Sequence, residues 1–334
     1  MVLAGSALAC AALMFPLCAW LRRAGIIDRP NERSSHTQAT LRGGGVGIVL
    51  VILGNLLLAP GMPQMVAALG VFALALVTGI SFRDDLKPLG VRIRMGVHVA
   101  AALLLVLALS DWYGMGPAFL LMAASVVWMV GYTNVFNFMD GINGLAAVQA
   151  ITTGVGTAML GLIGGLDPAH PAITLSLAIA GAALGFLPFN FPKAKVFMGD
   201  VGSASLGLAI AFVALWVMYA ARWWLAFPLV ALHANFLLDT SLTMFRRWRR
   251  GDVIYQAHRE HFYQLAVRSG LSHANVTVSI AIGQAGVLIL LGASSSSGKP
   301  VHLGLACAGV LLYWSVWFAY WAARFRRYTA SPLG

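Results

Sequence analysis

Residues 203–221 have the sequence SASLGLAIAFVALWVMYAA, nineteen residues without a charged side chain. About 20 consecutive apolar residues are enough for a helix to cross the hydrocarbon core of a bilayer. The apolar residues form a continuous run, whereas the strands of a membrane β-barrel alternate apolar and polar residues. The stretch therefore predicts a transmembrane helix.

The composition extends this prediction to the whole chain. The protein has 334 residues, of which 60% are hydrophobic and 10% charged, and its mean hydropathy is +0.82. Soluble domains carry about 25% charged residues, so this chain lacks the residues for a solvated surface of its size. The same composition excludes a disordered or collagen-like chain. Most of the chain must lie in lipid.

Ten further apolar stretches resemble the first, and together they predict an all-α, polytopic membrane protein with about eleven transmembrane helices. We expect residues 1–334 to form a single integral membrane domain, with no separate soluble part. The expected spans are 1–21, 44–60, 64–82, 95–110, 117–136, 146–166, 171–188, 203–221, 223–246, 275–293 and 303–323.

Charge predicts the orientation of these spans. The connections alternate between short, nearly uncharged ones and long, charged ones, and only Arg222 and Lys299 of the 22 Lys and Arg residues fall on the short side. Basic residues gather in cytoplasmic loops, so we expect the N-terminus outside and the C-terminus in the cytoplasm. Arg22 and Arg23 follow the first span, which favours a retained span over a signal peptide. The long loops are 22–43, 83–94, 137–145, 189–202 and 247–274, followed by the tail 324–334.

The acidic residues concentrate on the same side. Eight of the eleven lie in the predicted cytoplasmic loops, including the adjacent pair Asp84 and Asp85. Adjacent carboxylates repel one another unless a cation compensates, and Mg²⁺ is the natural cation where a phosphate is the substrate. The alternative is an interfacial helix cap with Arg83 and Lys87 as counter-charges. We expect Asp84 and Asp85 to support a metal site.

Residues 134–145 form the most specific segment. Asn137, Asp140 and Asn143 follow one another at intervals of three, which makes each pair neighbours on a helix. Gly141 and Gly144 allow close approach of a ligand to the backbone. Amide and carboxylate groups suit the edges of a base or a sugar. The alternative is a polar helix end with glycine caps.

Residues 189–203 place Asp200 between Gly199 and Gly202 at the start of the span quoted above. A helix N-terminus attracts anions, and we expect Ser203 to cap this one. With Lys195 nearby, the segment has the chemistry of a diphosphate site with a metal-binding acid. The alternative is an ordinary capped helix start with interfacial lysines.

The first and last long loops supply further cationic groups. In the first loop, an anion could be bound by Arg33, His36 and Arg42, and the amides of residues 43–45 could approach a phosphate, although the loop could also simply be flexible and basic. In the last loop, Arg259 and His261 suit contact with a phosphate or nucleotide, because no zinc-ligand spacing follows. We interpret four nearby arginines as a lipid headgroup anchor: Arg246, Arg247, Arg249 and Arg250.

These segments, in this order, resemble the polyprenyl-phosphate N-acetylhexosamine-1-phosphate transferase family, glycosyltransferase family 4. The form His258-Arg259-Glu260-His261-Phe262-Tyr263-Gln264 is most similar to its O-antigen-initiating, WbpL-type branch. The segments that carry the resemblance are 28–36, 42–45, 84–89, 134–146, 192–202 and 258–264.

The resemblance implies a reaction and its partners. Sugar-1-phosphate would pass from a UDP-N-acetylhexosamine to a polyprenyl phosphate such as undecaprenyl phosphate, leaving UMP, as the first step of O-antigen or other envelope glycan synthesis. The cofactor would be Mg²⁺, with Mn²⁺ as a substitute. The location would be the bacterial inner membrane, with the active site facing the cytoplasm; a homodimer is one oligomeric state that fits.

The resemblance also implies roles for the candidate residues. Asp200 would hold Mg²⁺ and the donor diphosphate, with Asp84 and Asp85 supporting the metal or activating the lipid phosphate. The nucleotide sugar would be bound by Asn137, Asp140 and Asn143, and Arg259 and His261 would contact the donor phosphate or sugar. We count Asp84, Asp85, Asp200 and His261 as catalytic and Arg33, His36, Arg42 and Lys195 as substrate-binding.

A secondary transporter of an anionic metabolite is the main alternative. Such a protein places polar groups and broken helices near the bilayer midplane and shows internal repeats. This chain gathers its charged motifs at one boundary and shows no repeat. A nucleic-acid partner is not expected, because no basic helix or zinc-finger spacing occurs. The three cysteines lie in apolar runs and imply no disulfide.

Overall fold

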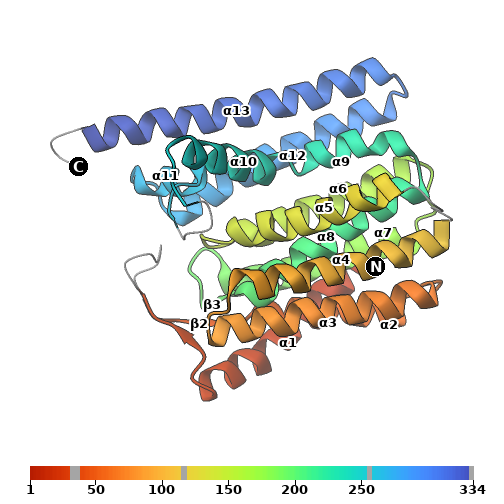
Figure 1. Ribbon diagram of the computed structural model, residues 1–334, viewed down its shortest axis with the longest axis horizontal. Helices are drawn as coiled ribbons and strands as arrows, with labels where there is room; N and C mark the ends of the chain where they lie inside the picture. Colours follow the sequence, from red (N-terminus) through yellow and green to blue (C-terminus); the bar gives the residue numbers. More distant parts are fainter. Residues whose placement is uncertain (31–37, 114–118, 254–257, 331–334) are drawn as a thin grey trace.

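The structure is a computed structural model that describes residues 1–30, 38–113, 119–253 and 258–330. It is a bundle of long helices that lie side by side, with the two marked ends of the chain toward opposite ends of the bundle (Figure 1). The all-α, polytopic fold predicted from the hydropathy is thereby confirmed. Whether residues 1–334 form one domain stays a prediction.

The helices follow one another along the chain, with longer connections between α1 and α2 and between α10 and α11. Their bounds are α1 (Val2–Arg23), α2 (Gly45–Leu58), α3 (Gln64–Leu86), α4 (Val91–Tyr113), α5 (Phe119–Phe138), α6 (Leu145–Ile163), α7 (Pro171–Asn190), α8 (Asp200–Ala220), η1 (Trp223–Leu225), α9 (Ala226–Leu232), α10 (Ala234–Arg249), α11 (Phe262–Arg268), α12 (His273–Ser296) and α13 (Pro300–Ala330).

Every one of the eleven expected spans contains a helix, but two of them are irregular. Among the described residues, nine helices are long and apolar enough to cross a membrane, and a bent pair would make a tenth. The α2 helix has only 14 residues, or about 21 Å, which is shorter than the hydrocarbon core of about 30 Å. The expected span 223–246 is broken at His233, where the chain bends by 69° between α9 and α10.

The centre of the bundle is α8, the helix quoted first. Its residues from Val201 to Val217 are all buried, mostly as small or branched apolar side chains. A Cβ on Gly207 would lie 2.8 Å from the Cα of Thr133, so glycine lets α8 approach the backbone of α5. Helices α1 and α13 lie at the outside, and only a small share of their residues is fully buried. The start of α8 is therefore held firmly from several sides.

Three short strands form a sheet that the sequence did not predict. They are β1 (Ile27–Asp28), β2 (Thr40–Arg42) and β3 (Val196–Phe197), in the order β1-β2-β3. The β2 strand pairs antiparallel with β1 and parallel with β3, and Arg42 lies opposite Phe197. Strands of two or three residues are too short to show an alternation of apolar and polar side chains, so the sequence could not predict them. The sheet ties the first loop to the segment before α8.

The glycine run after β2 packs against this segment instead of facing outward. The N–H groups of Gly44 and Gly45 donate to the carbonyl oxygens of Phe197 and Met198, both at 2.9 Å. These amides are therefore used inside the protein, and the expectation that they approach a phosphate is wrong for both. A Cβ on Gly45 would lie 2.1 Å from the Cα of Gly202, so the run serves close packing of α2 on α8.

Candidate active site

Four carboxylates lie close together, and burial and then the charges of their neighbours raise the pKa values of Asp140 and Asp200. The strands β2 and β3, which lead into this cluster, lie at one end of the bundle (Figure 1). Asp84 and Asp85 lie in the last turn of α3, Asp140 follows the end of α5, and Asp200 is the first residue of α8. Two arginines enter the same cluster, Arg42 from β2 and Arg94 from the first turn of α4. The residues come from four separate parts of the chain, as the sequence motifs predicted.

Asp85 holds the start of α8 in place. Its side chain is 1% exposed, and its two oxygens accept the backbone N–H groups of Asp200 and Val201, each at 3.0 Å. Arg42 Nη2 lies 2.7 Å from Asp85 Oδ1. Gly199 precedes the helix and has a φ of +76°, a backbone conformation that favours glycine. A Cβ at this position would lie only 2.7 Å from Asp85 Oδ2. A carboxylate at a helix N-terminus satisfies free amides and the positive end of the dipole.

The cap expected from Ser203 is absent. Its hydroxyl donates to the Gly199 carbonyl oxygen at 3.2 Å and accepts from Asn137 Nδ2 at 2.9 Å. Ser203 lies too far into α8 to cap it, because the helix already begins at Asp200. Asp85, from another helix, does this instead.

Arg94 was missed by the sequence analysis and lies between two of the acids. Its Nη1 is 2.9 Å from Asp84 Oδ2 and 3.7 Å from Asp200 Oδ2. The other Asp84 oxygen accepts the Leu89 N–H at 2.5 Å, which closes the turn between α3 and α4. This turn returns the chain so that the first turn of α4 faces the last turn of α3. The sequence indicated only that Arg94 lies in the same charged loop, 83–94, as Asp84 and Asp85.

Asp200 has longer contacts with the two arginines than Asp84 and Asp85 have. Arg42 Nη2 and Arg94 Nη1 lie 3.4 and 3.7 Å from its oxygens, and its side chain is 27% exposed. Within the described residues, no group of three or more His, Cys, Asp and Glu is arranged to hold a metal. Mg²⁺, however, is usually bound through one or two carboxylates together with substrate phosphates. Asp200 fits that donor set best, because both oxygens of Asp85 and both oxygens of Asp84 are already engaged by backbone N–H groups and arginines.

Asn137, Asp140 and Asn143 do not form the expected helical row, because α5 ends at Phe138. Asn137 contacts the start of α8, and Asn143 Nδ2 donates to the Pro192 carbonyl oxygen at 3.0 Å. Asp140 has no side-chain hydrogen bond or ion pair among the residues that the structure describes. Burial raises the pKa of Asp140 well above its ordinary value, and the charges of Asp200 and Asp85 raise this pKa further. Asp140 is the acid of the cluster that has no local partner.

The last loop reaches this cluster through Tyr263 of α11. Tyr263 Oη donates to the Phe138 carbonyl oxygen at 3.2 Å. A Cβ on Gly141 would lie 2.1 Å from the same Tyr263 Oη. Burial raises the pKa of Tyr263, and the charges of Asp239 and Asp140 add to the rise. The His261 ring stacks against the Tyr263 ring with centroids 5.8 Å apart. His261 is thus linked to the Asp140 segment by an aromatic side chain.

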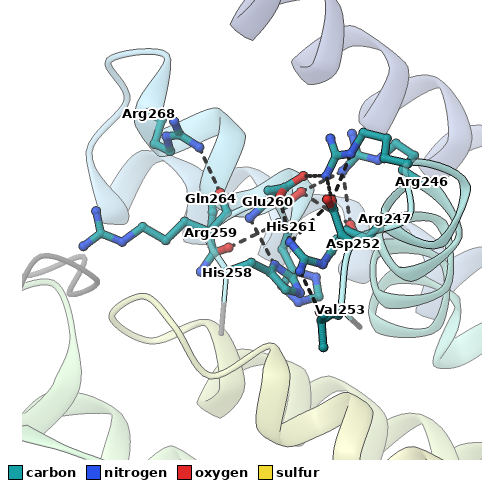
Figure 2. Close-up of polar contacts among 12 residues, drawn as sticks. Arg246, Arg247, Asp252, Val253, His258, Arg259, Glu260, His261, Gln264 and Arg268 are labelled. Atoms are coloured by element: carbon teal, nitrogen blue, oxygen red, sulfur yellow. Dashed lines mark hydrogen bonds and ion pairs between the residues drawn. The ribbon is translucent and has the colours of Figure 1, made fainter. Parts of the chain in front are cut away.

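Figure 2 shows that the arginines at the end of α10 hold the last loop. Arg247 Nη1 pairs with Glu260 Oε1 at 2.8 Å, and Arg250 pairs with both Asp252 and Glu260. Arg246 Nη2 donates to the Glu260 carbonyl oxygen at 2.7 Å. The guanidinium groups of these three arginines are engaged by this loop, and the interpretation of the arginines as a headgroup anchor stays a prediction. Arg249 is exposed.

The remaining predicted residues contribute less to this geometry. Arg33 and His36 lie outside the described residues. Lys195 is exposed, and within the described part of the chain it forms no ion pair with the carboxylates. Arg259 extends away from the His261 side of the loop (Figure 2), and its carbonyl oxygen accepts from Arg268 Nη1 at 3.1 Å.

Comparison with known proteins agrees with the motifs. The model of glycosyl transferase family 4 matches residues 67–218, which contain all four clustered carboxylates. The decaprenyl-phosphate N-acetylglucosaminephosphotransferase of Mycobacterium tuberculosis is 31% identical over 315 residues, covering 82% of this chain and 76% of that protein. The phospho-N-acetylmuramoyl-pentapeptide-transferase of Moorella thermoacetica is 32% identical over 226 residues, covering 60% and 70%.

A third relative is the undecaprenyl-phosphate alpha-N-acetylglucosaminyl 1-phosphate transferase of Thermotoga maritima. It is 30% identical over 191 residues, covering 57% of each chain. The protein belongs to glycosyl transferase family 4. It is therefore a membrane-embedded transferase, and the clustered carboxylates lie in the part of the chain that carries the family's sequence pattern.

Proposed function

We propose that this protein transfers N-acetylhexosamine-1-phosphate from a UDP-N-acetylhexosamine to a polyprenyl phosphate such as undecaprenyl phosphate. The products are a polyprenyl-diphospho-sugar and UMP. The observation that carries the proposal is the gathering of Asp84, Asp140 and Asp200 with Arg42 and Arg94 at one end of an apolar bundle. The names of the three relatives describe transfer of a phosphosugar, two of them to a polyprenyl phosphate, which supports the same reaction here.

The location of the cluster suits the two substrates. A long isoprenoid stays in lipid while its phosphate lies at headgroup level, and a nucleotide sugar stays in the cytosol. Nineteen of the 22 basic residues fall in the predicted long connections and the tail, and Arg246 lies at the end of the span that leads into one of them. This distribution supports a cytoplasmic orientation in the inner membrane. The lipid-linked sugar would serve as the primer of an envelope glycan such as an O-antigen.

The two substrates are both anionic, and the site must overcome their repulsion. Arg42 and Arg94 supply positive charge beside Asp200. Asp200, supported by Asp84, would hold Mg²⁺, which when bound supplies charge neutralisation at the phosphates. Asp85 positions this acid by fixing the first turn of α8. A phosphate monoester is already largely ionised at neutral pH, so the attacking group needs no strong base.

The donor would be held by the segments on the other side of Asp200. Asn137 and Asn143 present amide groups, and Asp140 presents a carboxyl group that no described residue engages. His261 and Arg259 would contact the donor phosphate or sugar from the last loop. Arg33, His36 and Lys195 remain candidates for further contact with the anionic substrates. A transporter would instead need its charged groups near the middle of the helices.

The test is UMP release by the purified protein. Undecaprenyl phosphate, Mg²⁺ and a panel of UDP-sugars are supplied, and UMP is expected only when lipid and donor are both present. A chelator should stop release and Mg²⁺ should restore it. Inverted membrane vesicles should use added UDP-sugar, whereas sealed right-side-out vesicles should not. Formation of UDP instead of UMP would contradict the proposal, because it would mean transfer of the sugar without its phosphate.

A further inference from the structure

Asp239 is a fully buried carboxylate on α10 to which the motifs assigned no role. It lies in the second half of the broken span and faces the start of α11. Its Oδ1 is 2.8 Å from His261 Nδ1 and accepts the Phe262 N–H at 3.1 Å. Its Oδ2 accepts the Tyr263 N–H at 3.2 Å. A single side chain therefore contacts the imidazole and the first two amides of the helix that follows it.

These contacts satisfy the charge of Asp239, and no Lys or Arg among the described residues forms an ion pair with it. Two helix N-terminal amides and an imidazole N–H are good donors to a buried carboxylate. Thr243 Oγ1, one turn along α10, adds a weaker contact at 3.3 Å. Because the carboxylate can only accept, the imidazole must place its proton on Nδ1. In the neutral ring the second nitrogen, Nε2, then carries a lone pair.

The surroundings leave Nε2 available and hold the ring still. No described residue forms a hydrogen bond with Nε2. The ring stacks on Tyr263 and lies 5.0 Å, centroid to centroid, from the His258 ring. The preceding residue is fixed as well, because Arg246 and Arg247 both engage Glu260. The ring is thus fixed both in position and in tautomer.

We propose that Asp239 is a positioning residue that holds His261 in the Nδ1-protonated tautomer, so that Nε2 can accept a hydrogen bond or a proton from the substrates. This inference rests on the proposed function, in which His261 contacts the donor. Asp239 itself touches no substrate, because it is fully buried behind His261. Asp85 has a similar place at α8, since each acid accepts the first two backbone N–H groups of a helix from another part of the chain.

The test compares Asp239→Asn with the wild type. Asparagine keeps one oxygen for the amides of α11 but turns an N–H₂ group toward His261 Nδ1, which favours the opposite tautomer. We expect kcat for UMP release to fall by about 10- to 100-fold, as for other lost partners of a functional histidine, with KM for the UDP-sugar nearly unchanged. The neighbouring Thr240 is buried with a hydroxyl that has no partner among the described residues, so Thr240→Val is the matched control and should keep wild-type kcat.

The tautomer is measured directly by solid-state ¹⁵N NMR of histidine-labelled protein. The His261 signals are assigned by their absence in His261→Gln. Wild-type protein should show a protonated Nδ1 and a bare Nε2, and Asp239→Asn should show the reverse. A bare Nδ1 in the wild type, or wild-type kcat in Asp239→Asn, would overturn the inference. If wild-type protein releases no UMP, the proposed function fails, and the NMR result alone still decides whether Asp239 fixes the tautomer.

Discussion

At the scale of single residues, adjacent side chains can have different tasks. Asp84 and Asp85 were predicted to act together on a metal, but successive residues on a helix point about 100° apart. Asp85 faces inward and caps α8, whereas Asp84 faces Arg94. The sequence motifs contain the right acids, and a pair of identical residues gives no indication of which one is buried.

Ionised Glu260 is predicted to stabilise the folded protein. Burial alone would raise the pKa of Glu260, but Arg250 and Arg247 outweigh it and hold this pKa below its ordinary value. A carboxylate with a lowered folded-state pKa stabilises the fold above the unfolded-state pKa of about 4.3, and this contribution is lost as the pH falls. We expect Glu260→Gln to lower the free energy of unfolding by about 1 kcal/mol at pH 7, since the pair is partly exposed.

Thermal unfolding in detergent between pH 3 and pH 8 measures this effect. The difference between wild type and Glu260→Gln should be largest at neutral pH and should shrink below about pH 4. Asp252→Asn, which removes the more exposed partner of Arg250 and a longer contact of 3.9 Å with Arg247, is the matched control and should lose less. A difference that stays constant across the whole range would show that ionised Glu260 contributes nothing.

At the scale of elements, glycines decide how two helices meet. The α2 helix starts where its Gly45 touches Gly202 of α8, and β2 and β3 lie directly beside this contact. The glycine motifs were recognised in the sequence, but their amides were assigned to a phosphate. Packing of one backbone on another cannot be read from a local pattern, because Gly45 and Gly202 lie far apart in the chain.

Gly45→Ala tests this element-scale account. The new Cβ would lie 2.1 Å from the Gly202 backbone, so α2 must move away from α8. Overpacking of this kind costs about 1–3 kcal/mol, and we expect a lower unfolding temperature together with reduced activity. Gly54 lies in the same helix with nothing within 4 Å of its Cβ position, so Gly54→Ala should be neutral or slightly stabilising. Equal behaviour of the two variants in thermal unfolding would refute the packing account.

At the scale of the whole molecule, hydropathy and charge were enough to predict the fold class and the end that carries the acids. They could not predict the break at His233 or the short α2, because both depend on packing against other helices. They also missed Arg94 and the Asp239–His261 contact, whose partners meet only in the folded chain. Long-range pairing of polar side chains is the part of the site that required the structure.

The central claim is that the carboxylates gathered at one end of the bundle form the catalytic site. UMP release by purified Asp200→Asn, compared with Asp167→Asn, tests it most directly, because Asp167 is an exposed carboxylate in the α6–α7 connection at the opposite end. The account predicts a loss of at least about 100-fold for Asp200→Asn, the scale of a lost metal ligand at transferring phosphates, with unchanged thermal unfolding. Asp167→Asn should keep wild-type activity. Wild-type turnover by Asp200→Asn, or an equal loss in both variants, would contradict the account.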